Sequence, residues 1–102
     1  LPFASQVDIA DAAGFIGRVD FLVDDCVVVE FDGMIKYAGQ TGQAALAKEK
    51  TREDRLRRAG YEVVRIVWSE LEDPSSILRR IEQARRLARE RRAAGLRAYR
   101  GA

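Results

Sequence analysis

The sequence predicts a small α/β domain in which a four-stranded mixed sheet is flanked by helices. Three short segments rich in branched and aromatic residues occupy the first third of the chain. Two long helical patterns follow, separated by a fourth apolar segment. The order strand, strand, strand, helix, strand, helix is typical of helices packed on a mixed sheet. A length of 102 residues, 47% of them apolar, suits a single domain.

The first three predicted strands are bounded by turn residues. Residues 3–10 and 15–23 form a pair of strands joined by the turn DAAG, and two aspartates then begin a second tight reversal. The third strand, residues 26–32, contains three successive valines and is apolar enough to be central. A loop with three glycines, residues 33–42, follows it.

Two helices and a fourth strand complete the prediction. Residues 43–59 form a helix that Gly60 is expected to cap at its C-terminus. Residues 61–68 form the fourth strand, and a turn leads to a second helix over residues 74–94, with Pro74 in its first turn. The apolar residues of this helix recur at helical spacing, so one of its sides should pack on the sheet.

The sequence indicates one domain over residues 1–94 and a flexible tail over residues 95–102. The chain opens directly at a strand, from which we expect a fragment of a longer protein that lacks an N-terminal helix. No apolar run is long enough to span a bilayer and the N-terminus does not resemble a signal peptide, so we expect a cytoplasmic protein without a membrane partner. The one cysteine, Cys26, excludes an internal disulfide and is expected to be buried.

Charge is unevenly distributed along the chain. Residues 1–33 carry seven acids and one base, whereas residues 34–102 carry 17 bases and nine acids. An acidic cluster set against a basic remainder suits a metal site that faces a polyanion, and a solvated surface of mixed charge is the alternative. Because the chain contains no histidine, any metal ligands must be oxygen atoms, which suits Mg²⁺, Mn²⁺ or Ca²⁺.

Two carboxylates close the third predicted strand. Glu30 and Asp32 share a face because side chains alternate along a strand. A two-residue turn would place Asp20 of the second strand opposite Val29, on the wrong side of the sheet. A three-residue loop makes opposing residue numbers sum to 50, which pairs Asp20 with Glu30 and Arg18 with Asp32. We predict this second register, because it alone gathers three carboxylates on one face.

Three carboxylates held together repel one another unless a cation relieves the repulsion. Mg²⁺ or Mn²⁺ bound there could polarise a phosphodiester and activate water. The alternative is structural: Asp32 accepts hydrogen bonds within a turn, and Glu30 pairs with Arg18 or Lys36.

Four segments of the chain resemble the PD-(D/E)XK, or restriction-endonuclease-like, nuclease superfamily. They are LPFASQVDIADAAG (1–14), RVDF (18–21), VVVEFDGMIKY (27–37) and EKTREDRLRRAGYEVVRIVWSEL (49–71). The branch resembled is a group of small very-short-patch-repair-like, endonuclease-related domains of unknown function. Such domains occur in C-terminal parts of actinobacterial proteins related to abortive-infection antitoxins. The resemblance covers roughly residues 1–72 and implies a restriction-endonuclease-like core.

The resemblance also implies roles for individual residues. Asp20 takes the place of the family's strand aspartate and Glu30 that of the acidic residue of the (D/E)xK element, both of them metal ligands. Asp32, as an assisting ligand, stands where the superfamily's lysine usually lies, which is the main departure from the pattern. The candidates for the displaced catalytic lysine are Lys36, Lys50 and Lys48. Candidate contacts to a nucleic acid are Arg18, Lys36, Tyr37, Lys48, Arg52 and Arg55.

Three functions remain open at this point. The first is a Mg²⁺- or Mn²⁺-dependent endonuclease that hydrolyses phosphodiester bonds in DNA. The second is a catalytically degenerate domain of the same fold that binds DNA or regulates, as an antitoxin-like domain would. The third is a scaffold or oligomerisation domain without a nucleic acid partner. Small nucleases of this fold often dimerise, so the resemblance also allows a homodimer.

Overall fold

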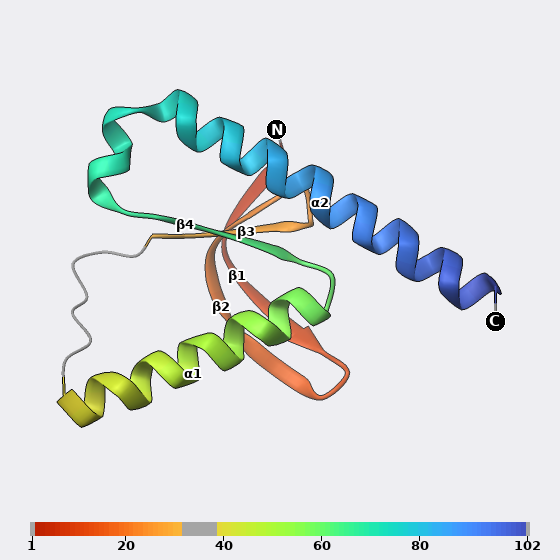
Figure 1. Cartoon of the computed structure of the whole chain (residues 1–102), viewed down its shortest axis with the longest axis horizontal. Coiled ribbons are helices and arrows are strands. Elements are labelled where there is room, and N and C mark those ends of the chain that lie inside the picture. Colours follow the sequence, from red (N-terminus) through yellow and green to blue (C-terminus); the bar gives the residue numbers. More distant parts are fainter. Residues whose placement is uncertain (1, 32–38, 102) are drawn as a thin grey trace.

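The computed structural model describes residues 2–31 and 39–101, and the side chains of residues 2–31 and 42–95. Four strands form one sheet that lies between two long helices (Figure 1). The strands are β1 (Phe3–Asp11), β2 (Gly14–Val23), β3 (Val27–Phe31) and β4 (Glu62–Ile66). They lie in the order β1-β2-β3-β4, with the first two pairs antiparallel and β3 parallel to β4. The predicted α/β class with a mixed four-stranded sheet is confirmed.

The helices are longer than the sequence predicted. Helix α1 spans Gly39–Arg58 and helix α2 spans Pro74–Gly101, so α1 begins earlier and α2 ends later than expected. The predicted turn before α2 contains a 3₁₀ helix, η1 (Trp68–Glu72). Among the described residues, no helix is both long and apolar enough to cross a membrane.

Gly60 ends α1 as predicted. Its φ of 102° lies in the left-handed region, which glycine adopts without a steric penalty. The Tyr61 amide donates to the Leu56 carbonyl and the Gly60 amide to the Arg57 carbonyl, both at 3.0 Å. These two bonds form a Schellman motif, which satisfies carbonyls that the helix end would otherwise leave free.

The hairpin between β2 and β3 has the predicted register. The backbone pairs are Phe21↔Val29, Leu22↔Val28 and Val23↔Val27, whose numbers sum to 50. Three residues form the loop, and two of them, Asp24 and Asp25, have positive φ angles of 53° and 57°. Left-handed residues of this kind are tolerated best by aspartate, asparagine and glycine, which explains the two acids at the reversal.

Both faces of the sheet are buried, each beneath one helix. Val27 and Val29 of β3 belong to a core with Ile77 and Ile81 of α2. On the other face, Val28 belongs to a second core that includes Leu56 of α1. A strand buried on both faces has a continuous apolar run rather than an alternating one, which accounts for the three valines of β3. Cys26 is buried beside the α2 core, as predicted.

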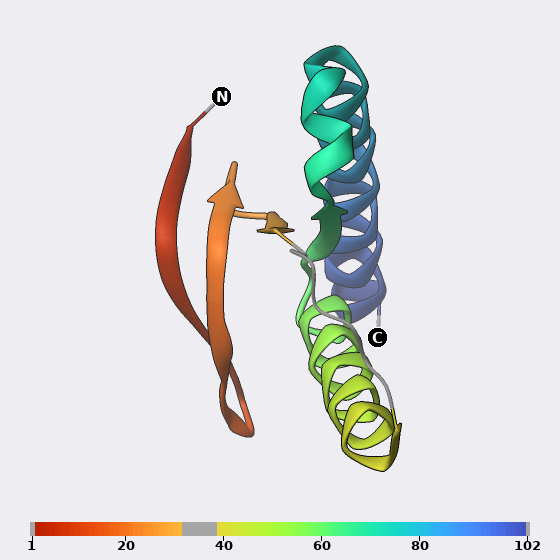
Figure 2. The same ribbon diagram turned by 90° about the vertical axis from the view of Figure 1, so that its left-hand side faces the viewer.

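The β1–β2 hairpin changes face part-way along its length. Val19 belongs to the core beneath α1, whereas Phe21 packs on the core beneath α2, although residues two apart in a regular strand share a face. Gln6 of β1 has a φ of 52° and lies opposite Asp20 in a gap of the backbone pairing. The two strands therefore curve, and Figure 2 shows β1 as the outer edge of the sheet, farthest from both helices. The curvature removes Asp20 from the regular alternation of side chains.

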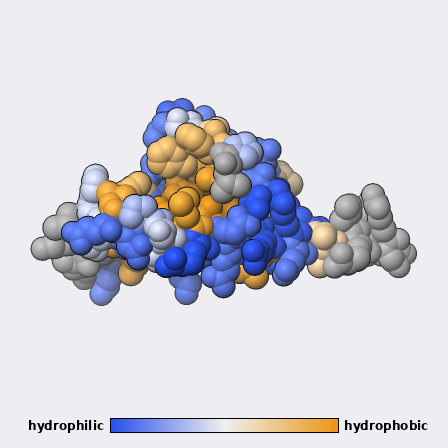
Figure 3. Space-filling model, turned by 90° about the horizontal axis from the view of Figure 1, so that it is seen from above, coloured by the Kyte–Doolittle hydropathy of each residue, from blue (hydrophilic) through white to orange (hydrophobic). Residues whose placement is uncertain are grey.

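The face of the sheet beneath α2 is incompletely covered. An apolar hollow of about 290 Å³ lies beside the first half of α2. Figure 3 shows apolar side chains gathered there next to the hydrophilic surface of the helix. Phe3 lines the hollow with 69% of its surface exposed. Trp68 is 59% exposed but lies against Phe31 with ring centroids 5.4 Å apart.

Candidate functional site

Asp20 lies where β2 and β3 separate. Backbone pairing between these strands stops at Phe21↔Val29, and the Phe31 amide donates instead to Asp20 Oδ2 at 2.8 Å. The carboxylate thus takes the place of a backbone acceptor at the end of β3. The backbone pair of Asp20 with Glu30 that the register predicted is not formed, but the Asp20 carboxylate lies beside the residue that follows Glu30.

Glu30 lies next to Arg65, its backbone neighbour on the parallel strand β4. The Glu30 side chain is only 12% exposed, and its Oε1 lies 2.5 Å from Nη1 of Arg52 on α1. This contact is an ion pair without hydrogen-bond geometry, because Oε1 forms no hydrogen bond. A buried carboxylate needs a positive partner, and here Arg52 supplies it.

Arg52 is fixed by further contacts. Its Nη1 donates to Glu49 Oε1 and its Nη2 to the backbone carbonyl of Arg18, both at 3.0 Å. A Cβ atom at Gly17 would lie 2.7 Å from Arg52 Nε, so this glycine leaves room for the guanidinium. Arg52, which the sequence suggested as a nucleic acid contact, therefore lies between α1 and the sheet and is already bonded on several sides.

Glu30 and Arg52 begin a chain of alternating charges that joins the sheet to both helices. Neighbouring members are 2.5 to 3.2 Å apart. We call it the Glu30–Arg91 ion-pair chain, and its members in order are Glu30, Arg52, Glu49, Arg65, Glu53, Arg57, Glu62 and Arg91. Alternation lets each charge in the chain contact a partner of opposite sign, which partly buried charges require.

The ion-pair chain shifts the pKa values of Glu49 and Arg65. Burial alone would raise the pKa of Glu49, but the hydrogen bond from Arg65 and the positive charge of Arg52 outweigh it, and the pKa lies below its ordinary value. Burial alone would lower the pKa of Arg65, but the hydrogen bonds to Glu49 and Glu53 outweigh it, and the pKa lies above its ordinary value. The chain is therefore fully charged at neutral pH at these positions.

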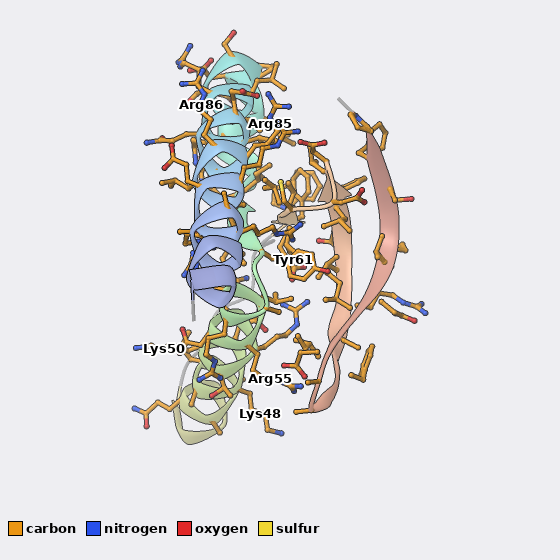
Figure 4. The ribbon with its side chains drawn as sticks, turned by 90° about the vertical axis from the view of Figure 1, so that its right-hand side faces the viewer. Lys48, Lys50, Arg55, Tyr61, Arg85 and Arg86 are labelled. Carbon is orange, nitrogen blue, oxygen red and sulfur yellow. The ribbon has the colours of Figure 1, made fainter. Side chains whose placement is uncertain are left out.

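Lys50 lies at a surface depression that adjoins this chain. The depression has a volume of about 370 Å³, and Glu49 and Arg65 line it together with Lys50. Figure 4 shows Lys50 pointing away from the β1–β2 hairpin. Lys50 is exposed and shares this depression with Glu49 and Arg65, but Glu30 is not among its lining residues.

Two other suggested nucleic acid contacts are engaged in ion pairs. Arg18 Nε lies 2.8 Å from Asp8 Oδ1 across β1 and β2 on the exposed surface, and this hydrogen bond lowers the pKa of Asp8. Arg55 lies 2.8 Å from Asp11 and also donates to the Phe15 carbonyl, so it ties α1 to the tip of the hairpin (Figure 4). Lys48 is exposed on α1. Asp32, Lys36 and Tyr37 lie outside the described residues.

Sequence reasoning missed the residues that neutralise the site. Arg52 was treated as a surface residue, and neither Glu49 nor Arg65 was considered. One signal was available: Arg65 interrupts the apolar strand EVVRI at a position that faces α1, and a charge there requires a partner.

Hard cations prefer oxygen ligands, and Mg²⁺ is usually held by one or two carboxylates with water filling its other positions. Asp20 and Glu30 are the two described carboxylates nearest the end of β3, but Asp20 accepts the Phe31 amide and Glu30 is already paired with Arg52. Within residues 2–31 and 39–101, no group of three or more acidic or cysteine side chains could hold a metal ion.

Comparison of the chain with protein-family models, curated proteins and solved structures gave no match.

Proposed function

We propose that this chain forms a divalent-cation-dependent nuclease domain of restriction-endonuclease-like architecture that acts on DNA. One observation carries the proposal: the three-residue loop and the Asp20–Phe31 hydrogen bond bring the carboxylates of two neighbouring strands to the end of β3. Strand β3 ends at Phe31, and Asp32 and Lys36 follow in the sequence. Strands hold such groups rigidly, as a metal site requires.

Asp20 and Glu30 would hold Mg²⁺ or Mn²⁺ in this proposal. Such an ion polarises a phosphodiester and lowers the pKa of bound water. Arg52 would then leave Glu30 for the phosphate, because a guanidinium binds phosphate oxygens through the same N–H groups with which it binds a carboxylate. Lys50, which lines the depression beside Glu49 and Arg65, would orient water or stabilise developing charge in this proposal.

A second function is favoured by a different observation. Arg52 already supplies the positive charge that a metal ion would bring to Glu30. A domain whose metal site has been replaced by an internal ion pair would bind DNA or regulate without cleaving. We keep this degenerate, regulatory domain as the competing proposal.

Calorimetric titration with Mn²⁺ distinguishes the two proposals. The nuclease proposal expects saturable binding in the wild type, no binding in Glu30→Gln, and tighter binding in Arg52→Gln, because that variant lacks the cation that competes for Glu30. Asp54→Asn is the matched control, since it removes a charge from an exposed position of α1. Plasmid nicking with Mn²⁺ should then follow the binding order of the wild type and Glu30→Gln.

Failure to bind Mn²⁺ in the wild type and in Arg52→Gln would contradict the nuclease proposal. Retention of DNA binding in the same proteins would then support the regulatory one. Binding that Glu30→Gln leaves unchanged would place any metal elsewhere and would contradict the assignment of the site.

A further inference from the structure

A second depression lies at the other end of the Glu30–Arg91 ion-pair chain. Its volume is about 420 Å³, and it lies between the end of α1 and the second half of α2. Four arginines line it, two from each helix, and the other lining residues are an alanine and two glycines. The arginines are Arg57, Arg58, Arg91 and Arg92. No acid is among these described lining residues, so the depression presents positive charge.

Three of the four guanidinium groups are held in place by contacts with other residues of the domain. Arg57 contacts Glu53 at 2.7 Å, and Arg91 Nη2 donates to the Tyr61 carbonyl at 2.9 Å. Arg92 Nε donates to the Gly60 carbonyl at 2.8 Å, and its guanidinium carbon lies 5.0 Å from the centre of the Tyr61 ring. Side chains fixed in this way lose little conformational entropy when they bind a ligand.

Each guanidinium carries five N–H donors, and these anchoring contacts use only some of them. Within the described residues, Nη2 of Arg57, Nη1 of Arg91 and both Nη atoms of Arg92 form no hydrogen bond. Arg58 forms neither a hydrogen bond nor an ion pair with any described residue and is exposed. The four side chains therefore retain donors for an anion.

Three other arginines of α2 are paired with acids outside the depression. Arg80 pairs with Glu70, and Arg85 and Arg89 both pair with Asp24. These contacts join α2 to η1 and to the β2–β3 loop. At the depression, by contrast, four arginines lie together, and only two described acids, Glu53 and Glu62, contact any of them.

We propose that this four-arginine depression binds phosphate groups of a nucleic acid backbone. A planar guanidinium matches phosphate oxygens with two parallel hydrogen bonds, and arginines on two helices can contact successive phosphates. The sequence around this part of α2 is also strongly basic, since residues 84–102 contain seven arginines and one glutamate. The site lies apart from Asp20 and Glu30 and needs no metal, so it does not rest on the proposed nuclease function.

The test is binding of a short fluorescein-labelled DNA duplex, followed by fluorescence anisotropy in EDTA over a series of salt concentrations. Arg58→Gln should weaken binding about tenfold, the scale of one lost hydrogen bond between charged groups. It should also reduce the slope of log K against log salt by about 0.9, since one phosphate contact is lost. Arg92→Gln should have an effect of the same kind.

Arg79→Gln is the matched control. It removes the same charge from an exposed position in the first half of α2, away from the depression, where Arg79 has no bonded partner among the described residues. Equal weakening by Arg79→Gln and Arg58→Gln would overturn the proposal, because it would show general attraction to a basic surface. Because Arg58 contacts no described residue, its variant should fold normally, which urea unfolding checks.

Competition with inorganic phosphate distinguishes a site for a nucleic acid backbone from a site for free phosphate. Displacement of the duplex by phosphate only at concentrations far above that of DNA phosphate supports a site built for a polymer. Tight calorimetric binding of inorganic phosphate, without duplex binding, would overturn the nucleic acid assignment. Because the binding assay contains EDTA, it measures duplex binding without metal-dependent cleavage. Duplex binding in EDTA, together with no cleavage when Mn²⁺ is supplied, would count against the nuclease proposal alone.

Discussion

The guanidinium of Arg52 and the carboxylate of Glu30 lie 2.5 Å apart between α1 and the sheet, and both side chains are largely buried. Removing Arg52 leaves the Glu30 carboxylate without its positive partner, whereas removing Glu30 leaves Arg52 paired with Glu49. We expect Arg52→Gln to lower the free energy of unfolding by about 2–3 kcal/mol, somewhat less than for a fully buried pair. Glu30→Gln combined with Arg52→Gln should be less harmful than the two single changes added together. Urea unfolding of all four proteins measures this coupling.

The exposed pair of Arg18 and Asp8 provides the control for that cycle. Their side chains are 62% and 57% exposed, so solvent screening should make their coupling much smaller than that of Arg52 with Glu30. A coupling between Arg52 and Glu30 as small as this would contradict the view that Arg52 neutralises the site.

The hydrogen bond from the Phe31 amide to Asp20 holds the end of β3. Asp20→Ala removes the acceptor, and we expect it to lower the free energy of unfolding by about 1–2 kcal/mol. Asp20→Asn keeps an acceptor oxygen and should cost less. Amide hydrogen exchange at Phe31 should be faster in Asp20→Ala than in the wild type. Asp25→Asn, at an exposed loop position that tolerates asparagine, should change stability by no more than about 0.5 kcal/mol.

The register of the β2–β3 hairpin could be predicted because a slip by one residue has a large penalty. Such a slip would move Glu30 to the face beneath α2 and would exchange the valines of β3 between the two cores. The Gly60 cap was equally predictable, since it depends on local backbone conformation. Both features are determined by residues that are close in sequence.

The ion pair of Glu30 with Arg52 could not be predicted in the same way. It depends on the parallel alignment of β3 with β4, which places Arg65 beside Glu30, and on the position of α1 above both strands. The change of face at Asp20 depends on the curvature of the whole hairpin, for which Gln6 gives no clear sequence signal. Asp20 and Glu30 were thus correctly placed on neighbouring strands, while their actual partners came from tertiary structure.

Gly60 and Gly95 should respond to alanine with opposite signs. At Gly60 the added Cβ would lie 3.1 Å from Arg92 Nε, and the residue would have to keep a φ of 102°. We expect Gly60→Ala to lower the free energy of unfolding by about 1–2 kcal/mol. Gly95 lies inside α2 with no atom near its Cβ position, so Gly95→Ala should stabilise by up to about 1 kcal/mol. Thermal unfolding of both variants tests this, and stabilisation by Gly60→Ala would contradict the assigned cap.

Glu49 should make the domain sensitive to acid. Its pKa in the folded protein lies below the ordinary value of 4.5, because the hydrogen bond from Arg65 and the charge of Arg52 outweigh the effect of burial. The unfolded chain therefore binds more protons than the folded one near and below pH 4.5. Its contribution to stability is complete above that pH and is lost as the pH falls through the lower, folded pKa.

Urea unfolding from neutral pH into this acidic range measures the effect. The free energy of unfolding of the wild type should fall steeply on acidification, and Glu49→Gln should be less stable at neutral pH but lose less on acidification. Part of the decline should persist in the variant, because Arg18 and Arg55 also lower the pKa values of Asp8 and Asp11. Glu90→Gln, at an exposed position of α2 without an ion pair among the described residues, should follow the wild-type curve. If the free energy of unfolding fell equally with pH in Glu49→Gln and in the wild type, the charge of Glu49 would not contribute to stability. That outcome would contradict the role assigned to its contacts with Arg52 and Arg65.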